Sequence, residues 1–460
     1  MNIIPSNRIQ RLHMVGIGGA GMSGIAEVLH ENGFIVTGSD TGEGPVIQYL
    51  KGLGIRVDST HEGKNVEGAD LLVYSSAVKM DNPEIVEAKA RRIPVIRRAE
   101  MLGELMRLKY TLAVSGTHGK TTTTSMLGSI WEAAGEDPTI IVGGVVKGKG
   151  SGAKVGRGNY LIAESDEFDR SFLSMMPTSA IITNIDADHL DTYKDIEEIK
   201  DAFVAFANKV PFYGQVVVCI DEPNIQAVLS RLIKPVVTYG FSRQAMYRVE
   251  NLHFEKGRPY FEVIRNGASL GEFELKVPGR HNVLNATAAI ALSVEENIPV
   301  ETARQALAEF IGVKRRFEFI GEAKNILVYD DYAHHPTESA ATLLGVREAF
   351  PERRVIVVFQ PHLFTRTRDQ HEAFGSAFAH CDMLLVCDIY KARELPIPGI
   401  TGNLVAESAI ARGHRDARFI GAKENAIEIL RKEAQPNDLV IFMGAGDVWK
   451  LEKSFLEALQ

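Results

Sequence analysis

The sequence predicts an α/β protein built from three domains, and two observations support this fold class. Short β-rich apolar segments alternate with longer stretches of helical periodicity along the whole chain, a rhythm typical of parallel sheets joined by crossover helices. The chain has 460 residues, enough for about three domains by a length prior of roughly 150 residues per domain. Breaks in the series of strands place the domains at residues 1–108, 109–313 and 314–460.

The first domain contains a glycine-rich turn between a strand and a helix. Its strands are predicted at residues 11–17, 33–39, 69–76 and 93–98. Gly16, Gly18 and Gly21 form the pattern G-x-G-x-x-G, and Asp40 follows about twenty residues later, after the next strand. Free N–H groups at a helix N-terminus bind phosphate, so the pattern predicts a Rossmann-like domain holding a pyrophosphate, with Asp40 near a ribose. Taken alone, it leaves open a nicotinamide or flavin site and a tight turn without a ligand.

The second domain begins a new series of strands. They are predicted at residues 110–116, 159–165, 179–185 and 214–220. Two further segments, 234–240 and 258–264, lie among polar spacers and suggest an antiparallel extension. A helix starting near residue 281 is expected to close the domain.

The strongest single motif follows the first strand of this domain. Gly116-Thr117-His118-Gly119-Lys120-Thr121 continues into a threonine-rich helix that starts with Thr122. The order predicts a P-loop, in which backbone N–H groups surround phosphate, Lys120 neutralises it and the Thr121 hydroxyl binds Mg²⁺. Val114 stands where the common form has a glycine. The alternative is a glycine-rich turn with no ligand.

Two acidic clusters follow other strands of the same domain. The first contains Glu164, Asp166, Glu167 and Asp169, and the second contains Asp186, Asp188, His189 and Asp191. Carboxylate oxygens suit Mg²⁺, and an ATP site needs a divalent ion beside its phosphates. Either cluster alone is more often a solvated loop.

Polar residues also follow the strands of the third domain, predicted at residues 326–335, 354–362, 381–390, 417–422 and 439–447. They are Asp330, Asp331, Tyr332, His334, His335, His362, Arg366 and Arg368. No helical H-x-x-x-H or H-E-x-x-H spacing supports zinc, whereas arginine and histidine donors suit a substrate that carries a carboxylate. Upstream, His281 and Asn282 either bind a base or cap a helix, and Arg315 and Arg316 either bind phosphate or are solvated.

Net charge and cysteine content narrow the partners and the cellular compartment that we expect. The net charge of −8, with no dense basic tract, argues against nucleic acid as a partner. The three cysteines form no C-x-x-C pair, and buried thiols suit a reducing cytoplasm. We expect no signal peptide and no membrane span.

The ordered motifs resemble those of the Mur ligases over essentially the whole chain. They read "GIGGAGMSGIA", "SGTHGKTTTT", "ESDEFDRSF", "TNIDADHLDTY", "GRHNVLNATAA", "KRRFE", "DDYAHHPTE" and "QPHLFTRTRD". The resemblance implies a UDP-sugar domain, a central ATP domain and a C-terminal domain that carries the amino-acid site and closes over both.

The same resemblance implies roles for individual residues. ATP would contact Gly116, Thr117, His118, Gly119, Lys120, Thr121, Thr122, His281, Asn282, Arg316 and Asp331. Thr121, Glu164 and His189 would hold Mg²⁺ or Mn²⁺, with Lys120, Glu164 and His189 as the catalytic set. The UDP-sugar would contact Gly16, Gly18, Gly19, Ala20, Gly21, Asp40, Ser75, Ser76, Asp166 and Glu167. The amino acid would contact Tyr332, His334, His362 and Arg366, whereas Leu363 replaces an arginine found in some relatives.

The implied reaction joins L-alanine to the lactyl carboxylate of UDP-N-acetylmuramate, at the expense of ATP and through an acyl phosphate, in a cytoplasmic enzyme that is a monomer or weak homodimer. Three alternatives compete with it. A related ligase would attach a preformed tripeptide to the same sugar. An NAD-dependent dehydrogenase would explain Gly16, Gly18 and Gly21 but leave the P-loop without a role. A binding protein would use ATP as a switch.

Overall fold

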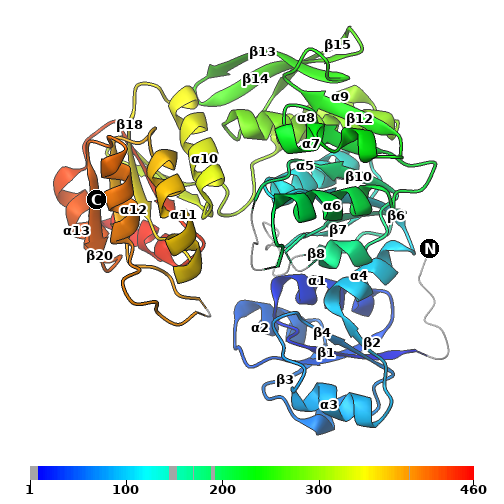
Figure 1. Cartoon of the computed structure of the whole chain (residues 1–460). Coiled ribbons are helices and arrows are strands. Elements are labelled where there is room, and N and C mark those ends of the chain that lie inside the picture. The colour runs from blue at the N-terminus through cyan, green and yellow to red at the C-terminus, as the bar shows by residue number, and fades with distance from the viewer. Residues whose placement is uncertain (1–8, 144–152, 169, 188–191, 393, 460) are drawn as a thin grey trace. The chain divides into compact units, whose positions relative to one another are not determined.

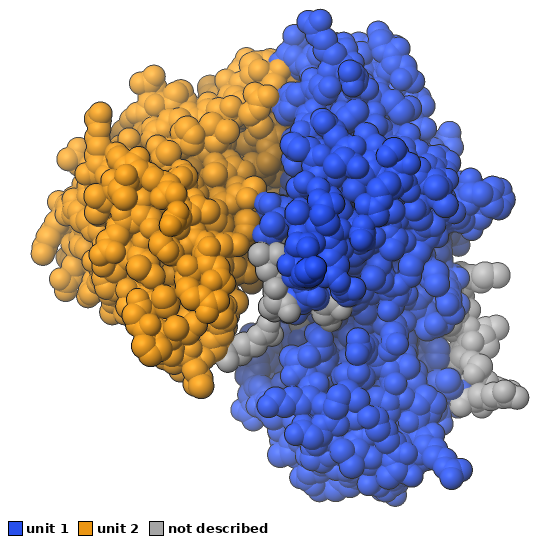
Figure 2. All heavy atoms as spheres, viewed as in Figure 1, with its two compact units in different colours: residues 1–251, 262–273, 284–309 blue, residues 252–261, 274–283, 310–460 orange. Residues whose placement is uncertain are grey.

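The computed structural model describes residues 9–143, 153–168, 170–187, 192–392 and 394–459. Its strands form three sheets, which confirms the predicted three-domain α/β class (Figure 1). The chain divides into two compact units, coloured in Figure 2. Unit 1 comprises Met1–Asn251, Glu262–Phe273 and Leu284–Glu309, and unit 2 comprises Leu252–Phe261, Glu274–Val283 and Phe310–Gln460.

The first sheet is parallel and has the order β3-β2-β1-β4-β5. Its strands are β1 (Arg11–Val15), β2 (Ile35–Ser39), β3 (Arg56–Asp58), β4 (Leu71–Tyr74) and β5 (Val95–Arg97), with helices α1 (Ala20–Glu31), α2 (Pro45–Gly52), α3 (Pro83–Ala90) and α4 (Arg98–Met106). The order reverses between β1 and β4, so the Gly16 turn after β1 lies at the switch point where ligands bind in such sheets.

The second sheet has the order β15-β14-β13-β12-β11-β10-β6-β9-β7-β8. Its strands are β6 (Tyr110–Ser115), β7 (Thr139–Ile141), β8 (Ala153–Lys154), β9 (Tyr160–Glu164), β10 (Ser179–Ile182), β11 (Val216–Cys219), β12 (Val236–Gly240), β13 (Tyr247–Glu255), β14 (Arg258–Arg265) and β15 (Ala268–Glu274). The helices are α5 (Lys120–Ala133), α6 (Ile196–Ala207), α7 (Pro223–Gln226), α8 (Arg280–Glu295) and α9 (Val300–Glu309). Parallel β6 lies between β10 and β9, which places the ends of all three strands side by side.

The predicted antiparallel extension is only partly correct. β12 pairs parallel with β11, so the prediction for residues 234–240 is wrong. Its buried Val237 and Tyr239 continue the parallel core, and polar flanking residues gave no signal of strand direction. Short turns connect β13 to β14 and β14 to β15, and because these neighbours are hydrogen-bonded, the connections are antiparallel hairpins.

The third sheet has the order β16-β17-β21-β18-β19-β20. Its strands are β16 (Glu318–Ala323), β17 (Ile326–Asp331), β18 (Arg354–Phe359), β19 (Met383–Cys387), β20 (Ala417–Gly421) and β21 (Asp438–Met443). The helices are α10 (Pro336–Ala349), α11 (Phe364–Ala377), α12 (Asn403–Ala411), α13 (Asn425–Glu433) and α14 (Glu452–Leu459). β16 is an antiparallel edge strand that the sequence did not predict.

Alternate residues of β18 enter different cores of this domain. Val355, Val357 and Phe359 pack with residues of α10, α11 and α12, whereas Ile356 and Val358 pack with residues of α13 and α14. Burial on both faces explains why the strand is continuously apolar. Among the helices that the structure describes, none is long and apolar enough to cross a bilayer.

Candidate functional site

The P-loop connects β6 to α5 and requires glycine at two positions. Gly116 has φ +131°, and a Cβ there would lie 2.1 Å from Thr183 Oγ1. Gly119 has φ +83° and forms the N-cap of α5. Any larger side chain would strain this backbone, so the arrangement of the loop's N–H groups depends on glycine at these two positions.

Thr183 and Asn184, directly after β10, bind the P-loop through hydrogen bonds. The His118 N–H donates to Asn184 Oδ1 at 2.8 Å, and Asn184 Nδ2 donates to the His118 carbonyl at 3.0 Å. The Thr183 hydroxyl donates to the same carbonyl at 2.6 Å. We did not predict Thr183 or Asn184, because their role depends on the pairing of β10 with β6, which the sequence does not show.

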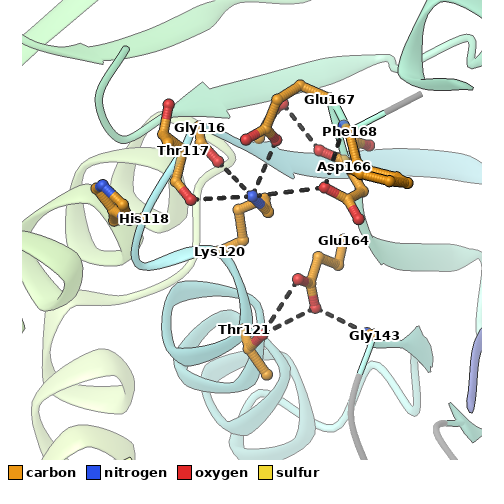
Figure 3. A network of polar contacts seen from close by, with 12 residues as sticks. Gly116, Thr117, His118, Lys120, Thr121, Gly143, Glu164, Asp166, Glu167 and Phe168 are labelled. Atoms are coloured by element: carbon orange, nitrogen blue, oxygen red, sulfur yellow. Dashed lines mark hydrogen bonds and ion pairs between the residues drawn. The ribbon is translucent and has the colours of Figure 1, made fainter. Parts of the chain in front are cut away.

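Lys120 lies at the centre of a polar network (Figure 3). Its Nζ donates to the carbonyls of Gly116 at 2.7 Å and Thr117 at 3.1 Å. It also lies 2.9 Å from Glu167 Oε2 and 3.7 Å from Asp166 Oδ1. Two residues predicted at the UDP-sugar, Asp166 and Glu167, therefore lie beside the P-loop.

Burial and neighbouring charges shift the pKa values of Lys120 and Glu167. Burial alone would lower the pKa of Lys120, but Glu167, Asp166 and Glu164 outweigh it and raise that pKa well above its ordinary value. Burial raises the pKa of Glu167 to about 7, against the opposing charge of Lys120. The ammonium therefore stays charged at neutral pH while Glu167 is poised to titrate.

A second set of oxygens lies one residue further along α5. The Thr121 hydroxyl is 3.1 and 3.0 Å from the two carboxylate oxygens of Glu164, and the Gly143 N–H donates to Glu164 Oε2 at 2.7 Å. Figure 3 shows this group below Lys120. Hydroxyl and carboxylate oxygens are suitable ligands for Mg²⁺ or Mn²⁺. His189, the third predicted ligand, lies outside the described residues.

Other predicted residues surround the same loop. His118 Nε2 is 3.2 Å from Asp186 Oδ2, and the Thr117 hydroxyl accepts from the Asp186 N–H at 2.9 Å. Thr122 is buried in the first turn of α5. A Cβ on Gly119 would lie 2.6 Å from Asn285 Oδ1, so Asn285 also lies against the loop. The i, i+3 spacing of Asn282 and Asn285 was the signal that we missed.

The glycine turn of the first sheet is held by Asp40 and Ser39. Asp40 accepts from the N–H groups of Gly18 and Gly42 at 2.8 and 2.9 Å. The Ser39 carbonyl accepts from Gly16 N–H at 2.8 Å. Gly19 forms the N-cap of α1, whose first residues are Ala20 and Gly21. Ser75 adjoins Gly16, its Cβ being 3.2 Å from the position of an added Cβ, and Ser76 is exposed at the end of β4.

The buried carboxylate of Glu84 binds the side chain of Ser39, whose carbonyl holds this turn. Glu84 is fully buried and accepts from Ser39 Oγ at 2.6 Å and Asn65 Nδ2 at 2.7 Å. His13 and His61 lie 3.2 and 2.9 Å from its oxygens. Burial opposes ionisation, but these hydrogen bonds outweigh it and lower the pKa of Glu84 to about 2.

The other predicted ATP residues belong to unit 2. Asp331 accepts from the N–H groups of Ala333 at 2.6 Å and Phe317 at 2.9 Å, and burial raises its pKa to about 6. Burial, followed by the charge of Arg316, lowers the pKa of His281 to about 4, so this ring is neutral near pH 7. Asn282 Nδ2 donates to the Pro278 carbonyl at 2.7 Å. The predicted ATP set is thus divided between the two compact units.

Three of the predicted amino-acid residues form one row of rings in unit 2. The ring centroids of Tyr332 and His334 are 5.2 Å apart, and those of His334 and His362 are 5.9 Å apart. Tyr390, which we did not predict, continues the row by stacking on His362 at 5.8 Å. Arg366 lies in the first turn of α11, which begins two residues after His362.

Comparisons with known proteins match nearly the whole chain. Three family models match it: "Mur ligase family, catalytic domain" at residues 11–110, "Mur ligase middle domain" at residues 114–293 and "Mur ligase, glutamate ligase domain" at residues 315–446. A protein of Sorangium cellulosum named UDP-N-acetylmuramate–L-alanine ligase is 50% identical over 96% of this chain and 94% of its own. One of the same name from a Geobacter species is 49% identical over 98% of both chains.

A solved structure agrees with these relatives. The UDP-N-acetylmuramate–alanine ligase of Thermotoga maritima is 31% identical, with a TM-score of 0.81 over 97% of this chain and 98% of its own. The three family models match, in order, the residues that form most of the three sheets of this chain. The chain therefore belongs to the Mur ligase family.

Proposed function

We propose that this chain is an ATP-dependent ligase that joins L-alanine to the lactyl carboxylate of UDP-N-acetylmuramate, releasing ADP and phosphate, in peptidoglycan precursor synthesis. The observation that carries the proposal is the match, at about half identity and nearly full length, to proteins named for this reaction. The P-loop around Lys120 supports the use of ATP, because its glycines, lysine and hydroxyl have the order that phosphate binding requires.

The first chemical step activates the carboxylate. A lactyl oxygen attacks the γ-phosphorus of ATP, the bond to the β–γ bridging oxygen breaks, and ADP leaves. The products are ADP and an acyl phosphate. Two anions must approach each other in this step, and the fixed positive charge of Lys120 offsets their repulsion.

The second step forms the amide. The neutral amine of L-alanine attacks the acyl carbon, phosphate leaves with the pair of electrons of the C–O bond, and the amine nitrogen loses a proton. Tyr332, His334, His362 and Arg366 are proposed to hold the amino acid. Arg366 would bind its carboxylate, because a guanidinium matches a carboxylate with paired donors.

The residues around Thr121 fit a divalent cation. Thr121 and Glu164 offer hydroxyl and carboxylate oxygens within 3.1 Å of each other, and His189 would complete the set. When bound, Mg²⁺ or Mn²⁺ would neutralise phosphate charge and orient the γ-phosphate.

The glycine turn is proposed to bind the pyrophosphate of the UDP-sugar. Gly16, Gly18, Gly19, Ala20 and Gly21 lead into α1, whose N-terminus favours phosphate. Asp40 and Ser75 adjoin this turn, and Asp40 would contact the uridine end. Ser75 and Ser76, which follow β4, would contact the UDP-sugar. Asp166 and Glu167 lie nearer the P-loop, where the sugar's reacting carboxylate has to arrive.

We assign residues 1–108 to the UDP-sugar, 109–313 to ATP and 314–460 to the amino acid. Each sheet falls within one of these ranges, although the compact units divide the chain differently. We further propose a cytoplasmic monomer or weak homodimer. The cytoplasmic location is supported by Cys219, Cys381 and Cys387, which are buried and unpaired.

The other enzymes considered are not favoured. A dehydrogenase leaves the match of the central and C-terminal regions unexplained, and a tripeptide ligase is disfavoured by the names of the half-identical relatives. The test supplies UDP-N-acetylmuramate and ATP with L-alanine, glycine, L-serine or tripeptide and measures phosphate release. We expect a preference for L-alanine; preference for tripeptide, or hydride transfer to NAD, would overturn the proposal.

A further inference from the structure

Helix α11 starts without a cap from its own sequence. Its N-cap residue is Leu363, whose side chain has no acceptor for the N–H groups of the first turn. Leu363 also has φ +71°, an uncommon conformation for a branched apolar residue. The start of α11 therefore needs support from another part of the chain.

Glu394 supplies that support from the segment after β19. Its Oε2 accepts from the N–H groups of Phe364 at 2.6 Å and Thr365 at 3.1 Å. Its Oε1 accepts from the Thr365 hydroxyl at 2.5 Å. A carboxylate that accepts from first-turn N–H groups satisfies the unpaired donors and interacts favourably with the helix dipole.

Tyr390 ties the same segment to the residues just before α11. The Leu363 N–H donates to the Tyr390 carbonyl at 3.0 Å, and the Tyr390 N–H donates to the Pro361 carbonyl at 2.8 Å. The Tyr390 ring stacks on His362 with an interplanar angle of 14°. Both sides of His362 are thereby fixed to one segment of the chain.

We propose that Glu394 is a positioning residue for the amino-acid pocket: by capping α11 it fixes Arg366, in the first turn of the helix, relative to His362, which lies two residues before the helix. The inference rests on the proposed function, since it assigns Arg366 and His362 to the L-alanine site. A pocket that binds a small amino acid must hold its few contacts closely, because displacements of about 1 Å cost large factors in rate or affinity.

The test compares Glu394→Ala and Glu394→Gln with the wild type in the full chain. The matched control is Asp382→Ala. Asp382 also accepts from a backbone N–H, that of Val355 at 2.7 Å. It precedes β19, so it lies at the N-terminal end of the strand, whereas Glu394 follows the C-terminal end. The measurements are the KM values for L-alanine, ATP and UDP-N-acetylmuramate, and hydrogen exchange of the Phe364 and Thr365 amides.

For Glu394→Ala we expect the KM for L-alanine to rise by roughly tenfold to a hundredfold, with the other two KM values nearly unchanged and faster exchange at both amides. Glu394→Gln keeps one acceptor oxygen, so its KM for L-alanine and its amide exchange should lie between those of Glu394→Ala and the wild type. This variant keeps the test valid if Glu394→Ala does not fold. Asp382→Ala should change all three KM values about equally. Equal changes in the three KM values for Glu394→Ala, or unchanged exchange of its Phe364 and Thr365 amides, would overturn the inference. Wild-type enzyme that does not use L-alanine would instead overturn the proposed function, and this assignment with it.

Discussion

Lys120 of the P-loop and Glu167, which follows β9, form an ion pair of 2.9 Å, with only 2% of the glutamate exposed. The carboxylate of Glu167 therefore contacts the ammonium that we assign to the ATP phosphates. Because like charges compete for one cation, an entering phosphate must share or displace this contact.

This competition should depend on pH, because burial raises the pKa of Glu167 to about 7. Below that pH the neutral carboxyl repels phosphate weakly, and above it the carboxylate repels phosphate more strongly. Wild-type affinity for ADP should fall between pH 6 and 8 relative to Glu167→Gln. Calorimetric titration of both proteins checks this, since titration of the nucleotide itself cancels in the comparison. Parallel affinity profiles for the two proteins would contradict it.

Loss of Lys120 should mainly impair turnover. Removing one preorganised electrostatic donor costs on the order of 2–4 kcal/mol of transition-state stabilisation. Lys120→Ala should therefore lose roughly 10²–10³-fold in phosphate release at saturating substrates. Lys200→Ala is the control, because Lys200 pairs with Glu197 on α6, outside the P-loop. Near-normal turnover by Lys120→Ala would show that the loop is wrongly assigned.

Glu84 should make the first domain sensitive to acid. Its hydrogen bonds lower its pKa to about 2 in the folded chain from an ordinary value of 4.5, so its stabilising effect is complete above pH 4.5 and is lost as the pH falls towards 2. Glu84→Gln should lower the free energy of unfolding near pH 7 by roughly 1–3 kcal/mol.

Urea unfolding of the two proteins between pH 7 and 3 measures this effect. The difference between wild type and Glu84→Gln should shrink as the pH falls. Glu87→Gln provides a control on the same helix, because Glu87 forms an exposed pair with Arg91 and should change stability little. A constant difference between wild type and Glu84→Gln across this range would refute the proposed linkage.

The sequence predicted the parallel cores and the glycine loops because both leave local signals. Continuous apolar strands such as Val216–Cys219 and the Gly116–Thr121 motif depend only on neighbours along the chain. Thr183 and Asn184 were missed because their role comes from a neighbouring strand. Tyr390 and Glu394 were missed because contacts with α11 arise only when segments some thirty residues apart pack together. The edge strand Glu318–Ala323 was missed because none of its residues is buried and it lacks an apolar run.

Gly116→Ala should disrupt the P-loop through a specific collision. A Cβ at this position would lie 2.1 Å from Thr183 Oγ1, and φ is +131°. Either the loop or Thr183 must move, and Thr183 also holds the His118 carbonyl. We expect loss of most ATP-dependent turnover, by roughly 10²-fold or more, because loop N–H groups displaced by about 1 Å no longer match the phosphates.

Gly135→Ala separates this collision from the general cost of positive φ. Gly135 follows the same helix, α5, has φ +78° and has no heavy atom within 4 Å of an added Cβ. Its substitution should lower the free energy of unfolding by about 1 kcal/mol while leaving kcat unchanged. Thermal unfolding and phosphate release measured on both variants test the pair. Comparable kcat losses in the two would mean that backbone strain, and not the contact with Thr183, makes glycine necessary at position 116.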